Sequence, residues 1–274
     1  MYVTRRLRDA PSIAMLVAFV ALTLYPLAFM VITSLKDLAQ YNEQFWLPVW
    51  PLHFENYTAA WAAIAPYMLN SVIVTGASAA GVVVLSCFAA YAFARFAFPG
   101  REIFYYLVIF LLMIPAVLTL VPSFLLVKSL GLMNTRWALI LPYVAGGQVL
   151  AIFIMRAFFA GLPEELFEAA RIDGAGEIGA FWRIAIPLTR PILVTIAIIQ
   201  VLSTWNDYVW PFLVVQDDSL KTLVVGLVLF QTRFYTNWGP LMAGYTLASI
   251  PLLLLFFVGM RYFIEGLTSG ALRA

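Results

Sequence analysis

Few side chains in this sequence have the types and spacing that could perform chemistry. His53 is the only histidine and Cys87 the only cysteine among 274 residues. Catalytic triads that use histidine, HExxH zinc sites and cysteine metal sites therefore cannot be assembled from this chain. The sequence also contains no phosphate-binding loop of the form GxxxxGK[ST]. We therefore expect no ATP hydrolysis, no catalytic residues, and no bound metal or cofactor in this chain.

The main polar interruption in the second half of the chain is residues 161–190. Pro163 suits the first position of a helix, and three glutamates follow within about two turns, where the helix dipole favours acids. Gly174 stands where a left-handed residue would end that helix. Apolar residues then recur at helical spacing up to Pro187, which we expect to stop a second amphipathic helix. This pattern predicts a helical hairpin. The three glutamates are Glu164, Glu165 and Glu168; the recurring apolar residues are Ile178, Phe181, Trp182 and Ala185.

Several positions of this hairpin follow a distinctive order. They are Glu168-Ala169-Ala170, Asp173-Gly174-Ala175, Phe181 and Ile184-Ala185-Ile186-Pro187. The order resembles the EAA loop of permease subunits of ATP-binding-cassette (ABC) importers, in which this loop is the coupling helix that docks in a cleft of the ATPase. The resemblance implies an ATPase-coupling role for Glu168, Ala169, Ala170, Asp173, Gly174, Ala175 and Phe181. The alternative is an amphipathic hairpin that lies on the membrane without a partner.

Composition places the chain among membrane proteins. Hydrophobic residues make up 64% of it and charged residues 11%, far outside the usage of soluble domains. The net charge of +2 gives no reason to expect a nucleic-acid partner. The sequence therefore predicts an all-α protein that contacts membrane lipid along most of its length.

Six apolar runs are long enough to cross a bilayer, which needs about 20 residues. We expect one transmembrane domain over residues 1–274, a cytoplasmic loop at 161–190, and external loops at 35–66 and 214–238. Pro115 and Pro122 interrupt the third run, where they indicate either a path-lining kink or ordinary distortion. The expected spans are 11–33, 68–93, 103–124, 137–157, 191–212 and 240–262.

The distribution of basic residues sets the expected orientation. With both termini in the cytoplasm, eleven of the sixteen lysines and arginines fall on the inside, as the positive-inside rule requires. This orientation also places the 161–190 hairpin in the cytoplasm. We therefore expect both termini in the cytoplasm, and the resemblance to importer permeases implies a bacterial or archaeal cell membrane.

A polar cluster follows the fifth apolar run: Trp205, Asn206, Asp207 and Tyr208. Asp207 would lie about 24 Å beyond Arg190 along a helix, toward the outer edge of the hydrocarbon core. The favoured interpretation is an interfacial aromatic belt. Because aromatic faces beside amide and carboxylate groups also suit sugars, the four residues remain candidates for a substrate path.

Further stretches resemble the carbohydrate-uptake branch of these permeases, the group that contains the smaller permease of the maltose transporter. They are Asn70-Ser71, Tyr91-Ala92-Phe93-Ala94-Arg95, Gly131-Leu132-Met133-Asn134-Thr135, Trp205-Asn206-Asp207-Tyr208 and residues 265–271. The resemblance implies the six-helix fold of type I ABC importers and three kinds of partner. These are a second, non-identical permease, two ATPase subunits that hold ATP and magnesium, and an external solute-binding protein. By the same resemblance, Phe234, Tyr235, Asn237 and Trp238 are candidate contacts of the binding protein.

The residues leave the transported solute open. The outside segments carry five basic and six acidic residues, so no charge marks an anionic solute. We favour a neutral oligosaccharide, with glycerol phosphate or another polyol derivative as the alternative. An autonomous channel or ion-coupled carrier is a different class, but it would need ionisable residues near the midplane, and only Asp207 comes close.

Overall fold

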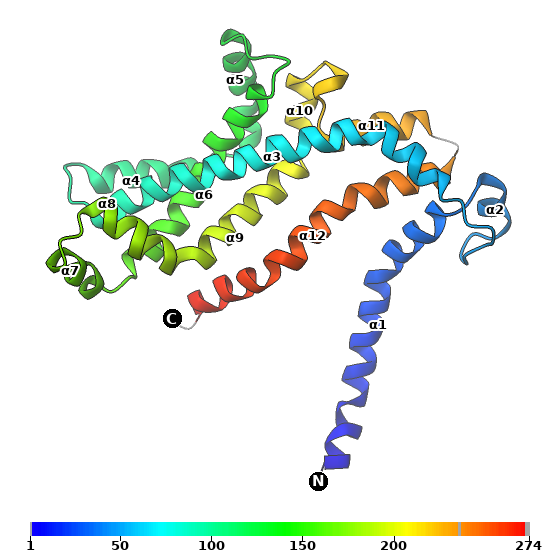
Figure 1. Ribbon diagram of the computed structural model, residues 1–274, viewed down its shortest axis with the longest axis horizontal. Helices are drawn as coiled ribbons and strands as arrows, with labels where there is room; N and C mark the ends of the chain where they lie inside the picture. Colours follow the sequence, from blue (N-terminus) through cyan, green and yellow to red (C-terminus); the bar gives the residue numbers. More distant parts are fainter. Residues whose placement is uncertain (1, 235–236, 272–274) are drawn as a thin grey trace. The chain divides into compact units, whose positions relative to one another are not determined.

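The computed structural model describes residues 2–234 and 237–271 (Figure 1). The described residues form helices and connecting turns, with no strand among them. The predicted all-α fold is therefore confirmed. Packing groups the chain into two compact units: unit 1 is Met1–Ala65 with Gly226–Ile250, and unit 2 is Pro66–Val225 with Pro251–Ala274.

Unit 1 holds α1 (Tyr2–Ser34), α2 (Leu38–Glu43) and the first turns of α3 (Glu55–Arg95). It also holds most of α11 (Leu223–Arg233) and the first part of α12 (Trp238–Ala271). A buried lysine organises the loop after α1: the Lys36 ammonium donates to the carbonyls of Gln44 (2.5 Å) and Phe45 (3.1 Å). Its burial lowers the pKa of Lys36, because the charged form loses hydration.

Gly239 provides the space that this loop needs. An added Cβ would lie 2.2 Å from the Lys36 carbonyl oxygen and 2.6 Å from Asn56 Nδ2, whose amide donates to the carbonyls of Ser34 and Lys36 at 2.9 Å each. We expect Gly239→Ala to destabilise the chain by about 1–3 kcal/mol, the usual cost of overpacking. Thermal unfolding of the purified protein measures this. The control is Gly76→Ala in α3, where no non-neighbouring described atom lies within 4 Å; equal unfolding midpoints would contradict the prediction.

Unit 2 holds the rest of α3, all the elements between α3 and α11, the first residues of α11 and the last part of α12. Two buried apolar clusters support it: one joins α3 to the hairpin and its flanking helices, and the other packs Val74, near the middle of α3, with Leu139 and Trp210. The remaining elements of unit 2 are α4 (Arg101–Phe110), η1 (Leu111–Met113), α5 (Ala116–Ser129), α6 (Trp137–Ala160), α7 (Glu164–Ile172), α8 (Glu177–Ala180), the π-helical η2 (Phe181–Ala185), α9 (Ile186–Trp205), α10 (Val209–Val214) and η3 (Asp218–Leu220).

Five described helices are long and apolar enough to cross a membrane, and a bent pair gives a sixth candidate. In that pair, residues 101–113 and 116–129 meet at 103°, so the third apolar run is not one straight helix. The bend falls at Ile114 and Pro115, whose ψ angles of 115° and 131° are extended. Proline disfavours helical backbone at the residue before it, which explains the break. Pro122, in contrast, lies inside α5.

Candidate functional site

The hairpin predicted from the sequence is present as α7, a tight corner and α8. Pro163 is the N-cap of α7, with ψ 132°, and not its first helical residue as predicted. At the corner Gly174 has φ +79°, and the Ala175 amide donates to the Ala170 carbonyl at 2.8 Å. The positive φ confirms the predicted left-handed glycine. A residue in this conformation lets the last carbonyls of a helix accept hydrogen bonds.

The second helix does not stop at Pro187, and this prediction was wrong. α8, η2 and α9 run without a break from Glu177 to Trp205. The turn before the proline is π-helical, with the Ile186 amide donating to the Phe181 carbonyl five residues earlier. This wider turn shifts the hydrogen-bond register just before Pro187, so its missing N–H falls in the first turn of α9, where it costs little.

One side of the hairpin is buried in unit 2. Phe167 is 1% exposed and Phe181 4% exposed. The Phe181 ring lies 5.0 Å from Tyr91 and 5.1 Å from Phe88, both on α3, and it also contacts Phe159 of α6. Aromatic pairs at these separations add to the free energy of apolar burial. Phe181 is thus a core residue that anchors the hairpin, and not a surface residue.

The other side of the hairpin is exposed. Around Gly174 no non-neighbouring described atom lies within 4 Å of an added Cβ. Ile172 is 87% exposed and Ile178 76% exposed, on either side of this corner. Among the other predicted coupling residues, Glu168, Ala169 and Asp173 are exposed, while Ala170 and Ala175 are half-buried. An apolar patch of this kind, rimmed by charged residues, is typical of a protein interface.

Arg95 joins the end of α3 to the start of the hairpin. Its guanidinium donates to the Leu162 carbonyl at 2.7 Å, pairs with Glu164, and lies 4.0 Å from the centroid of the Phe167 ring. In the sequence, Arg95 carries no signal of this role beyond its place at the end of the Tyr91–Arg95 stretch. Because 69 residues separate Arg95 from Glu164, no local pattern could have linked them.

The four residues of the second candidate site do not converge. Trp205 is buried at the end of α9, while the Asn206 side chain donates back to the Leu202 carbonyl and Tyr208 stacks on Phe212. The Asp207 carboxylate lies in the turn before α10, where it accepts hydrogen bonds from the Tyr143 hydroxyl (2.9 Å) and the Trp210 amide (3.4 Å). Asp207 therefore has a structural partner that the sequence did not reveal.

A cavity of about 390 Å³ lies among α3, α6 and α9, at the start of α5. Its polar lining residues are Tyr143, Gln200 and Ser203. The Gln200 amide donates to Thr204 Oγ1 at 3.0 Å, and Gly147 leaves room for it, since an added Cβ there would lie 2.4 Å from Gln200 Oε1. These polar groups are uncharged, and the lining contains no basic or acidic side chain.

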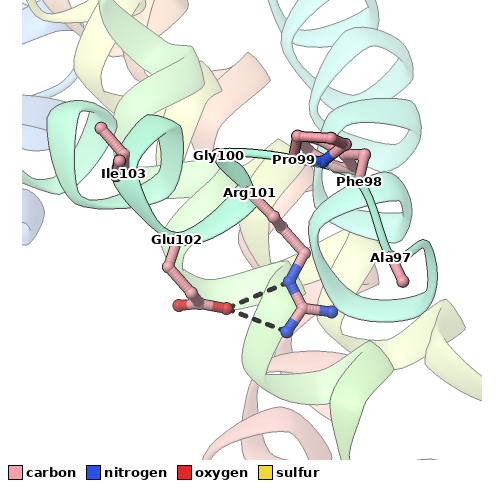
Figure 2. Close-up of a pocket in the computed structure, with 7 residues that line it drawn as sticks. All are labelled: Ala97, Phe98, Pro99, Gly100, Arg101, Glu102 and Ile103. Atoms are coloured by element: carbon pink, nitrogen blue, oxygen red, sulfur yellow. Dashed lines mark hydrogen bonds and ion pairs between the residues drawn. The ribbon is translucent and has the colours of Figure 1, made fainter.

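The turn before α4 and the first residues of α4, residues 97–103, line an open pocket of about 560 Å³, shown in Figure 2. Its charges are already satisfied: Arg101 contacts Glu102 at 3.0 Å, and Arg156 donates to the same carboxylate at 3.0 Å. This arrangement holds α4 against α6 and leaves no free charge for chemistry.

The candidate contacts of a binding protein lie in unit 1. Trp238 stacks on Tyr41, with ring centroids 5.6 Å apart, and Phe234 packs against Phe230 at 4.6 Å. The backbone N–H of Asn237 donates to the Phe234 carbonyl at 2.9 Å. Phe234, Asn237 and Trp238 are all half-buried. Tyr235 lies outside the described residues.

Comparison with known proteins decides the family. The sequence pattern of the family described as "Binding-protein-dependent transport system inner membrane component" matches residues 82–269, well over half of the chain. The chain belongs to this family. As an inner membrane component of this kind, it is a multi-pass membrane protein of a transport family, and the predicted family resemblance is confirmed.

Relatives of this inner membrane component cover nearly all of its length. The diacetylchitobiose uptake system permease protein NgcG of Streptomyces coelicolor is 34% identical over 96% of this chain and 89% of its own. The sn-glycerol-3-phosphate transport system permease protein UgpE of Yersinia pestis is also 34% identical, over 92% of this chain and 93% of its own. A solved bacterial ABC transporter involved in alginate import has a TM-score of 0.83 at 24% identity, covering 95% of this chain and 98% of that one. The predicted importer permease fold is confirmed.

Proposed function

We propose that this chain is the permease subunit of an ATP-driven importer that carries a neutral sugar, in the first instance an oligosaccharide, into the cell. The observation that carries the proposal is the two-sided hairpin. Phe167 and Phe181 fix one side in the core of unit 2, while the side around Gly174 is exposed and partly apolar. A segment built in this way can receive force from a partner and pass it to the helices.

The proposed partners follow from the family. Two ATPase subunits with ATP and magnesium would dock on the exposed side of the hairpin through the 168–175 corner. A second, non-identical permease would complete the path, and an external binding protein would deliver the solute. The hairpin and both termini would be cytoplasmic, in agreement with the eleven basic residues expected on that side.

The proposed mechanism is alternating access driven by the ATPase cycle. Closure of the ATPase pair would move the hairpin, and its ring contacts with α3 and α6 would pass that movement to the spans. Since α8, η2 and α9 are continuous, α9 would move with the corner. The cavity beside Gln200 would then open alternately to the two sides.

The chemistry of that cavity supports a neutral solute. Amide and hydroxyl groups of Gln200, Ser203 and Tyr143 can exchange hydrogen bonds with sugar hydroxyls. A phosphate ester would be expected to meet arginine or lysine, and the lining has neither. Because the chain is similar to a glycerol-phosphate permease, glycerol phosphate is the alternative solute.

An uptake panel tests the proposal. The chain, its partner permease and the ATPases, taken from adjacent genes, are reconstituted in liposomes with the binding protein outside. Radiolabelled raffinose, diacetylchitobiose and glycerol 3-phosphate are supplied in parallel. We expect ATP-dependent uptake of a sugar. Uptake of glycerol 3-phosphate alone would favour the alternative solute, and uptake without ATPase subunits would favour a channel or ion-coupled carrier.

A substitution in the cavity tests its role. We expect Gln200→Leu to lower sugar uptake by about tenfold, because the loss of one or two hydrogen bonds to a solute costs about 1–2 kcal/mol. The control is Gln148→Leu, the removal of an amide on α6 that donates weakly, at 3.4 Å, to backbone carbonyls of α3 and does not line the cavity. Equal uptake by both variants would show that Gln200 does not contact the solute.

A further inference from the structure

Arg95 is the last residue of α3, yet its side chain is only 11% exposed. All three of its contacts named above are made with the beginning of the hairpin, on both sides of Pro163. A guanidinium can serve a carbonyl, a carboxylate and an aromatic face at once because it is planar and carries five donors. A lysine could not reproduce this set of contacts.

The contact continues along the hairpin through exposed charges. The second oxygen of Glu164 accepts from Arg171 at 3.3 Å, and Arg171 Nε donates to Glu177 at the start of α8 at 3.4 Å. These outer side chains are about half exposed, so each such pair contributes little to stability. Arg95 differs, because it is nearly enclosed and its contacts have fixed directions.

The hairpin has covalent links to α6 and to α9, but none to α3. Its attachment to α3 depends on ring packing around Phe181 and on Arg95. Ring packing is only weakly directional and tolerates sliding, whereas hydrogen bonds weaken steeply when they are misaligned. Arg95 is therefore the contact that sets the position of α7 relative to α3.

We propose that Arg95 is a positioning residue that clamps α7 to the end of α3, so that displacement of the hairpin moves α3 with it. This inference rests on the proposed coupling function and adds the residue through which α3 takes part. Glu164 is its charged partner, and Phe167 supplies the surface on which the guanidinium rests.

The same chain contains a matched control. The Arg156 guanidinium lies 3.7 Å from the centroid of the Tyr105 ring and donates to Glu102 at 3.0 and 3.2 Å. Like Arg95 it has a buried Nε without a partner among the described residues. It links α6 to α4, however, and its recorded contacts include no hairpin residue. Arg156→Lys therefore imposes the same chemical change away from the clamp.

The first test measures position directly in the assembled transporter. In a Cys87→Ala background, spin labels are attached at Ile172→Cys on the hairpin and Leu85→Cys on α3, which are 87% and 53% exposed. Distances are recorded without nucleotide and with MgATP plus vanadate. With Arg95 present we expect a single narrow distribution in both states. Arg95→Lys and Glu164→Gln should broaden it, and Arg156→Lys should not. An unchanged distribution in both clamp variants overturns the proposal.

The second test measures coupling. Arg95→Lys complexes should keep their subunits and their basal MgATP hydrolysis, but lose most of the stimulation by the binding protein, by about fivefold or more. The charge-reversed pair Arg95→Glu with Glu164→Arg should recover part of it. Broadened distances with undiminished stimulation would overturn the transmission role of Arg95. If Gly174 variants also kept full stimulation, the proposed coupling function itself would fail.

Discussion

Replacing Gly174 by tryptophan is expected to remove most ATP-driven uptake while the chain still inserts and folds. No non-neighbouring described atom lies within 4 Å of an added Cβ at this position, so the internal cost is that of the left-handed backbone, about 1–2 kcal/mol. A close-fitting ATPase cleft, in contrast, could not accept an indole. Uptake should therefore fall by about a hundredfold, equivalent to about 2.7 kcal/mol. Uptake in proteoliposomes and the amount of co-purified ATPase measure this.

Two variants distinguish a loss of docking in the ATPase cleft from the effect of backbone strain. Gly131 has φ +69° and equally open surroundings, so Gly131→Trp carries the same strain at a turn outside the hairpin. Gly174→Asn keeps a residue that tolerates left-handed backbone but adds little bulk. We expect both to retain most uptake. Loss of uptake in Gly131→Trp as large as in Gly174→Trp would show that strain, and not docking, is responsible.

Phe181→Ala should produce a large loss of stability. The ring is 4% exposed and contacts aromatic residues of both α3 and α6, so its removal leaves a cavity under the hairpin. Such truncations cost about 3–5 kcal/mol, a large part of the stability of a domain. The unfolding midpoint, read from monodisperse protein after heating, should fall by on the order of 10 °C.

The adjacent tryptophan supplies the control. Trp182 is larger than Phe181 but is 54% exposed, so Trp182→Ala removes less buried surface. We expect a fall in the midpoint of less than about half that of Phe181→Ala, and a small effect for Phe181→Leu, which fills part of the cavity. A larger fall for Trp182→Ala would contradict the assignment of Phe181 as the anchor of the hairpin.

Local signals explain what the sequence could predict. The acids after Pro163 and the glycine at 174 act within their own helix turns, so α7 and its corner were predicted without knowledge of the rest of the chain. Pro187 does not end its helix as its residue type predicts, because the effect of a proline depends on the turn before it. At Pro115 the sequence indicated either a path-lining kink or ordinary distortion, and the structure has a 103° bend there.

Contacts between distant residues could not be predicted. Arg95 meets Glu164 across 69 positions, and Tyr143 meets Asp207 across 64. Phe181 was recognised as part of a pattern, but which side of its helix would be buried depends on the placement of α3 and α6. The cavity lined by Gln200 and Ser203 was likewise missed, since its polar groups lie inside otherwise apolar runs.

Cysteine accessibility tests the central claim most directly. Ile172→Cys in a Cys87→Ala background places one highly exposed thiol beside the corner of the hairpin. A membrane-impermeant maleimide should label it in inside-out vesicles that contain the permease without ATPase, but not in right-side-out vesicles. Assembly with the ATPases should protect it. Labelling from the outside, or equal labelling with and without the ATPases, would contradict the account.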